Sequence, residues 1–243
     1  MWAVSVVHTD DSLRWQRRLR SVSFAEISVD PRGLKYLCRR DVFSQVGRVL
    51  DSLPPGLVFL GDGSFHHLSY HLIRRCASEP LGLVVFDGHG DYLPAPEGYV
   101  SCGSWLAEAL KLPGVHQTVL IGPEDRGDLP SNVLWVPPKS SEQVIAKISV
   151  PTRRVYVSID KDVLAEASTY WGSGKLTLAA LLRLLSWVCG RYELVGADVC
   201  GEIAPRGPWA TDLELQEIRR NEDINLSICR VLSGPRGRFR SCA

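Results

Sequence analysis

Acidic residues and histidines follow two apolar runs of this 243-residue sequence in a pattern that suits metal chemistry. Five potential ligands come directly after residues 83–86 and 155–159: Asp87, His89, Asp91, Asp160 and Asp162. Carboxylates combined with neutral imidazole suit Mn²⁺ or a comparable divalent ion better than thiolate sites do. Four carboxylates would also balance the four positive charges of two divalent ions. The spacing therefore predicts a centre that holds two metal ions.

Two further polar clusters also come directly after apolar runs. Residues 57–60 precede a glycine-containing turn with His66 and His67, and residues 194–197 precede Asp198 and Glu202. In an open parallel sheet, ligands bind beyond the carboxyl ends of the strands. We therefore expect all four clusters to meet at one edge of a sheet.

Short apolar runs that alternate with helical patterns predict the elements that position these residues. The expected strands are buried on both faces and cover residues 57–60, 83–86, 118–121, 133–136, 155–159 and 194–197. The expected helices cover residues 66–77, 104–110, 141–148, 177–189 and 212–232, with Thr177 as an N-cap. This alternation predicts an α/β fold, a three-layer doubly wound parallel sheet with helices on both faces. We expect one domain over residues 1–243 and a loose basic tail over residues 234–243.

Composition excludes several classes of function. Twenty-eight Lys and Arg residues against 27 Asp and Glu leave a formal net charge of +1, which argues against nucleic acid or an anionic membrane as a partner. The seven cysteines form no CxxC pair and read as reduced thiols. The N-terminus lacks the pattern of a signal peptide, and no apolar run reaches the roughly 20 residues that cross a bilayer. We therefore expect a soluble cytoplasmic protein.

In identity and order, the four clusters resemble those of the arginase and agmatinase (ureohydrolase) superfamily, whose fold is shared with the related deacetylases. The resemblance spans residues 61–205 and is carried by the DxHxD and SxDxD elements, with GSGKLTL at residues 172–178 resembling the family's GGLT segment. It implies a binuclear manganese centre held by the five residues above. A histidine of the first turn would be the sixth ligand; His66 is preferred and His67 is the alternative.

The resemblance also implies roles in catalysis. Asp91 would pass a proton to the leaving nitrogen, and Glu202 would hold the substrate guanidinium, with Asp198 as its competitor. The family has a proton-transferring histidine after DxHxD. This chain has Cys102 at the most similar position, either as a proton carrier or as a packed thiol.

The implied activity is hydrolysis of a guanidino group to urea and an amine. Free arginine, agmatine, another guanidino compound and arginine within a peptide stay open as substrates. The short chain suggests an open site that could admit a peptide, as a hypothesis second to the general one. One rival is a deacetylase-like amidohydrolase with a single zinc, and a second is a catalytically silent scaffold on the same fold. A homo-oligomer is compatible with the family, and the sequence does not indicate its surface.

Overall fold

The centre of the protein is an eight-stranded sheet in which all paired strands are parallel. The computed structural model describes residues 3–138, 150–207 and 209–234. The strand order is β2-β1-β4-β10-β9-β5-β7-β8. The strands are β1 (Ala3–His8), β2 (Ala25–Ser28), β4 (Gly56–Phe59), β5 (Leu81–Phe86), β7 (Val115–Ile121), β8 (Val133–Val136), β9 (Arg154–Asp160) and β10 (Glu193–Cys200).

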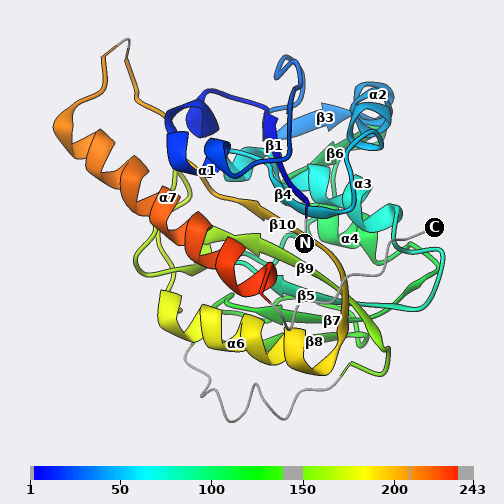
Figure 1. Cartoon of the computed structure of the whole chain (residues 1–243). Coiled ribbons are helices and arrows are strands. Elements are labelled where there is room, and N and C mark those ends of the chain that lie inside the picture. Colours follow the sequence, from blue (N-terminus) through cyan, green and yellow to red (C-terminus); the bar gives the residue numbers. More distant parts are fainter. Residues whose placement is uncertain (1–2, 139–149, 208, 235–243) are drawn as a thin grey trace.

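Helices cover both faces of this sheet, as Figure 1 shows. One face packs against α6 (Leu178–Arg191), α7 (Asp212–Leu232) and α1 (Arg17–Ser21). The other face packs against α2 (Arg40–Leu50), α3 (Ser69–Arg74) and α4 (Trp105–Ala109). All six residues of β5 are buried, because a central strand covered on both faces has no side that meets water. The predicted α/β class, with helices on both faces of a parallel sheet, is confirmed.

Several predicted elements match the structure closely. Strand β8 and helix α7 have the predicted bounds, and the Thr177 hydroxyl caps α6 by accepting a hydrogen bond from the amide of Ala180 at 3.2 Å. The region expected to form a helix over residues 66–77 differs. It is divided into a 3-10 helix, η2 (Gly63–Leu68), and the short helix α3. The tighter helix turns His66 towards the sheet edge.

The sequence reading missed β1, β2 and α2, and the small antiparallel pair of β3 (Leu37–Arg39) and β6 (Tyr99–Ser101). Helix α2 could have been found from its buried face, since Phe43, Val46, Gly47 and Leu50 follow helical spacing. The predicted helix at residues 141–148 and nearly all of the predicted tail lie outside the described residues. Within the described ranges, no helix combines the length and apolar character needed to cross a membrane.

Candidate metal centre

The predicted ligands come together at the carboxyl ends of neighbouring strands. Asp87 directly follows β5, Asp160 is the last residue of β9, and His66 lies in η2 after β4. Strands β4, β10, β9 and β5 are consecutive in the sheet and parallel, so these ends meet at one edge. The DxHxD and SxDxD loops and η2 therefore deliver their side chains to the same place.

The first group of possible ligands is His66, Asp87 and Asp91. The His66 Nδ1 atom lies 3.2 Å from Asp87 Oδ2 and 3.3 Å from Asp91 Oδ2. Asp160 Oδ2 is next to this group, at 3.7 Å from the same nitrogen. One imidazole nitrogen therefore faces three carboxylates.

The second group shares Asp87 with the first and adds His89 and Asp162. His89 Nδ1 lies 2.6 Å from Asp162 Oδ2 and 3.7 Å from Asp87 Oδ1. Asp162 is held in place because its Oδ1 accepts a hydrogen bond from the amide of Gly88 at 2.7 Å. Two ligand groups that share a carboxylate are an arrangement suited to two neighbouring cations, since a shared oxygen donor offsets their repulsion.

Two buried polar atoms that lack hydrogen-bond partners among the described residues are consistent with a cation at this position. His66 Nδ1 and Asp87 Oδ2 are buried and make no hydrogen bond to any described residue, although they lie 3.2 Å apart. Buried polar atoms normally find a partner, and a metal ion between them would supply it. Carboxylate and imidazole donors of this kind suit Mn²⁺ and similar ions.

The crowding of carboxylates also raises their affinity for positive charge. Burial and the neighbouring Asp162 raise the pKa of Asp160 to about 8, and burial with Asp87 raises the pKa of Asp91 to about 7. Asp87 behaves differently: although it is buried, its contacts with His66 and His89 lower its pKa to about 2. Metal ions would replace the protons that the raised pKa values retain at neutral pH.

A buried hydrogen-bond chain orients His66. The Ser158 hydroxyl donates to Asp198 Oδ1 at 2.9 Å, so its oxygen is left to accept from His66 Nε2 at 3.0 Å. Proton placement on Nε2 leaves the lone pair of Nδ1 directed at the carboxylates. Asp198 also accepts from Ser69 at 2.8 Å and Tyr156 at 2.8 Å. Asp198, which the sequence offered as a second candidate to hold the substrate, lies behind His66, a candidate ligand.

Asp91 is held by strained backbone and by a tryptophan. Its φ of 47° lies in the left-handed region, which is uncommon for a residue with a side chain. Its Oδ2 accepts a hydrogen bond from Trp105 Nε1 at 2.7 Å, and the Trp105 ring lies 4.5 Å from that of His66. The sequence reading missed Trp105, whose signal is an aromatic residue at the start of the helix that follows the DxHxD loop.

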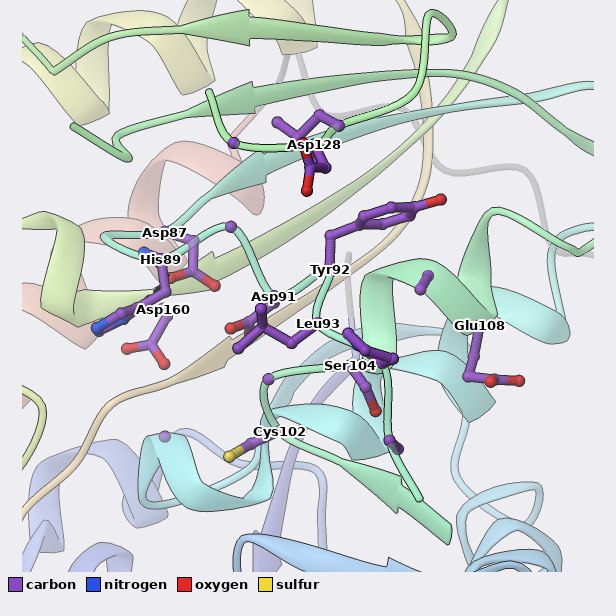
Figure 2. Close-up of a pocket in the computed structure, with 18 of the residues that line it drawn as sticks. Asp87, His89, Asp91, Tyr92, Leu93, Cys102, Ser104, Glu108, Asp128 and Asp160 are labelled. Carbon is purple, nitrogen blue, oxygen red and sulfur yellow. Dashed lines mark hydrogen bonds and ion pairs between the residues drawn. The ribbon is translucent and has the colours of Figure 1, made fainter. Parts of the chain in front are cut away.

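A cavity of about 1050 Å³ opens in front of the ligands. In Figure 2, Asp87, His89, Asp91 and Asp160 gather in one part of it, and Glu108 lies well apart from them. Arg40 donates to Glu108 at 2.8 Å and Lys111 donates to it at 2.9 Å, so this far part is polar. The cavity thus has room for a molecule much larger than the group that would meet the metals.

Glu202 does not reach this cavity. Its side chain is buried, forms an ion pair with buried Lys161, and accepts hydrogen bonds from Gln16 at 2.6 Å and Asn225 at 2.6 Å. Gly201, the residue between β10 and Glu202, adopts a φ of 87°. The prediction that Glu202 contacts a substrate does not fit this position, because both carboxylate oxygens are occupied inside the protein.

The cysteines and the second histidine of the first turn also have distinct positions. Cys102 lines the cavity, and burial together with Asp91 raises the pKa of its thiol to about 12. Cys200, which the sequence reading did not single out, donates to Asp160 Oδ2 at 3.2 Å. His67 is turned away from the carboxylates and packs 5.8 Å from the Phe43 ring. His66 is therefore the histidine that the structure brings to the cluster.

Comparison with known proteins shows what the sequence and the fold are similar to. No protein-family model matches the chain. An uncharacterized protein of Thermotoga maritima is 35% identical over 217 residues, which cover 89% of this chain and 84% of that protein. Arginase from Bacillus cereus has a TM-score of 0.69 at 16% identity, with 96% of this chain and 99% of that chain covered. Proclavaminate amidino hydrolase from Streptomyces clavuligerus has a TM-score of 0.67 at 20% identity, with 98% and 93% covered.

The chain belongs to the family of the Thermotoga protein, and its fold is that of the ureohydrolase superfamily. The predicted resemblance is thereby confirmed for the fold. In this chain the carboxyl ends of β4, β10, β9 and β5 lie along one edge of the sheet, where the possible metal ligands are found.

Proposed function

We propose that this chain is a manganese-dependent hydrolase with two metal ions, which hydrolyses a guanidino group to urea and an amine. The observation that carries the proposal is the pair of ligand groups that share Asp87 and face one cavity. His66, Asp87, Asp91 and Asp160 would hold one ion. His89 and Asp162 would hold the other together with Asp87, the carboxylate that the two groups share.

Two divalent ions at this place would lower the pKa of bound water towards neutrality and so supply the nucleophile. The residues of the chain orient this centre and handle protons. Asp91 is the ligand whose proton role we propose, because its carboxylate lines the cavity while Trp105 fixes one of its oxygens. From there it can pass a proton to the leaving nitrogen. Cys102, with a thiol pKa of about 12, keeps its proton at neutral pH and serves better as part of the wall.

The substrate we favour is an arginine side chain within a peptide, which would become ornithine. Ordinary small-molecule pockets span roughly 300–1000 Å³. The cavity here, at about 1050 Å³, exceeds what a free amino acid fills. The six described cysteines are free thiols, which supports our prediction of a reducing compartment such as the cytoplasm. Homo-oligomer formation also stays a prediction.

The experiment loads the purified protein with Mn²⁺ and measures urea released from arginine, agmatine and arginine-containing peptides. We expect urea from at least one of these substrates and none from the Asp160→Asn variant, which removes the carboxylate that lies beside the first ligand group, 3.7 Å from His66 Nδ1. Urea from none of the three substrate classes, with two metal ions bound, would refute the guanidine-hydrolase proposal and favour the silent scaffold.

Metal analysis separates the deacetylase-like alternative. The two ligand groups, each with a histidine and at least two carboxylates, favour about two Mn²⁺ per chain. A single Zn²⁺ bound in preference to Mn²⁺, with release of acetate from acetylated amines, would instead support the amidohydrolase.

A further inference from the structure

The proposed activity leaves the substrate guanidinium without a recognised partner. Glu202 is enclosed by its own hydrogen bonds, and the carboxylates that cluster with His66 and His89 are candidate metal ligands. Glu108, another carboxylate of the cavity, is already paired with Arg40 and Lys111. A guanidinium ion is a planar, weakly hydrated cation that binds either to carboxylates or to the faces of aromatic rings. An aromatic side chain beside the candidate ligands could therefore bind the guanidinium group.

Trp171 occupies such a position. It lines the cavity together with the ligands, its ring centroid lies 5.7 Å from that of His89 at an interplanar angle of 74°, and it is 40% exposed. A Cβ atom at Gly63 would lie 2.7 Å from Asp160 Oδ2 and 3.0 Å from Trp171 Cδ1. Glycine at that point is what allows the indole ring to approach the carboxylates so closely.

The loop around Trp171 fixes the ring before any substrate arrives. The amide of Trp171 donates to Thr169 Oγ1 at 3.1 Å, and the same hydroxyl donates to the carbonyl of Gly172 at 2.6 Å. The Tyr36 ring packs edge-on against the indole, with centroids 5.8 Å apart. A ring that is already ordered loses little conformational entropy when it binds a ligand.

The neighbouring aromatic residues are less suitable for the same task. Lys35 Nζ lies over the Tyr36 ring at 5.2 Å and over the Tyr170 ring at 5.8 Å. Those two rings already have a cation beside them. Trp105 lies closer to the candidate ligands, but it is fully buried and does not line the cavity. Trp171 combines the strongest cation-binding ring type with an exposed position beside His89.

From this geometry we infer that Trp171 forms the wall against which the guanidinium group of the substrate stacks, in place of a carboxylate grip. The inference rests on the proposed function. The indole face attracts the cation and holds its plane beside the metal centre. Because the ring interacts with the bound substrate rather than with the reacting bond, its loss weakens substrate binding more than it slows the chemical step.

The test compares three variants loaded with Mn²⁺. Trp171→Leu removes the aromatic face, Trp171→Phe keeps a weaker one, and Trp209→Leu is the matched control, because Trp209 is 86% exposed and does not line the cavity. Calorimetry measures binding of N-acetyl-arginine amide and of the uncharged N-acetyl-citrulline amide. Bound manganese and unfolding midpoint are measured on the same samples, and KM and kcat are measured wherever urea is released.

We expect Trp171→Leu to weaken binding of the arginine probe about 3- to 30-fold, with a matching rise in KM. Trp171→Phe should recover most of the loss, and Trp209→Leu should bind as the wild type does. The citrulline probe should respond much less, because it has no charge, and manganese content should not change.

Unchanged binding of the arginine probe by Trp171→Leu overturns the inference, as does an equal loss for the citrulline probe or no measurable binding by the wild-type protein. The proposed function is tested separately by urea release. If the wild type binds the arginine probe through Trp171 and releases no urea, the hydrolase proposal fails and the assignment of Trp171 stands.

Discussion

Two buried serines provide a sharp test of how the protein orients its candidate metal ligand. Ser158 and Ser69 both donate a hydrogen bond to Asp198 Oδ1, at 2.9 and 2.8 Å. Only Ser158 also contacts His66, whose Nε2 lies 3.0 Å from the serine oxygen. Each serine-to-alanine replacement therefore removes one hydrogen bond to Asp198 Oδ1. The Ser158→Ala variant also removes the bond that orients His66.

The two variants should differ most in metal binding. Partners of a metal-binding histidine contribute about 10- to 100-fold to metal affinity, so Ser158→Ala should weaken Mn²⁺ binding by that factor. Ser69→Ala should bind Mn²⁺ nearly as the wild type does. Each buried hydrogen bond contributes about 1 kcal/mol to folding, so the metal-free stability should fall by about 2 kcal/mol for Ser158→Ala and about 1 kcal/mol for Ser69→Ala.

Calorimetric titration with Mn²⁺ measures the affinity of the first and second ions, and urea unfolding of the metal-free proteins measures stability. The reasoning would be refuted by equal losses of Mn²⁺ affinity in the two variants. It would also be refuted by wild-type affinity in Ser158→Ala, because either result means that the bond to His66 does not hold the imidazole for the metal.

Four further predictions concern the same site. Asp87→Asn should reduce bound Mn²⁺ from two ions to one or none by metal analysis, because Asp87 belongs to both ligand groups. The metal-free protein should lose stability as pH rises from 6.5 to 8. Asp160 and Asp91, with pKa values of about 8 and 7, bind protons more tightly in the folded protein than in the unfolded chain, and this advantage is lost as they ionise. Glu202→Gln should lower the free energy of unfolding by about 3–5 kcal/mol in urea unfolding, because it leaves a buried cation unpaired. Cys102→Ala should keep urea release within about threefold of the wild type.

Each of these has a contrary outcome. Asp125→Asn, a change at another cavity carboxylate, should keep both metal ions; loss of metal there would show that Asp87→Asn acts non-specifically. The pH effect should shrink when Mn²⁺ is bound, and a metal-free stability that rises between pH 6.5 and 8 contradicts it. If Glu202→Gln has normal stability and a raised KM, Glu202 contacts the substrate after all. A loss above 100-fold in Cys102→Ala would make the thiol a proton carrier.

Local patterns made much of the fold predictable. The strand before Asp87 is a continuous apolar run, and β9 is apolar from Val155 to Ile159 except for Ser158. Thr177 is followed by a strongly apolar helix, so apolar runs and capping were enough to find these elements. The edge strand β2 was missed because its residues alternate between partly buried and exposed and include Glu26, which gives only a weak strand signal.

By itself, the sequence determined which residues are candidate metal ligands: the residue types and spacings of DxHxD and SxDxD put carboxylates and an imidazole at the ends of parallel strands. Only the tertiary structure decided how the other residues are used. It places His66, and not His67, beside the carboxylates, because the 3-10 turn directs the His66 ring towards them and packs the His67 ring near Phe43. It enclosed Glu202 with Lys161 and brought Trp171 to the cavity, since these contacts join segments that are far apart in the chain.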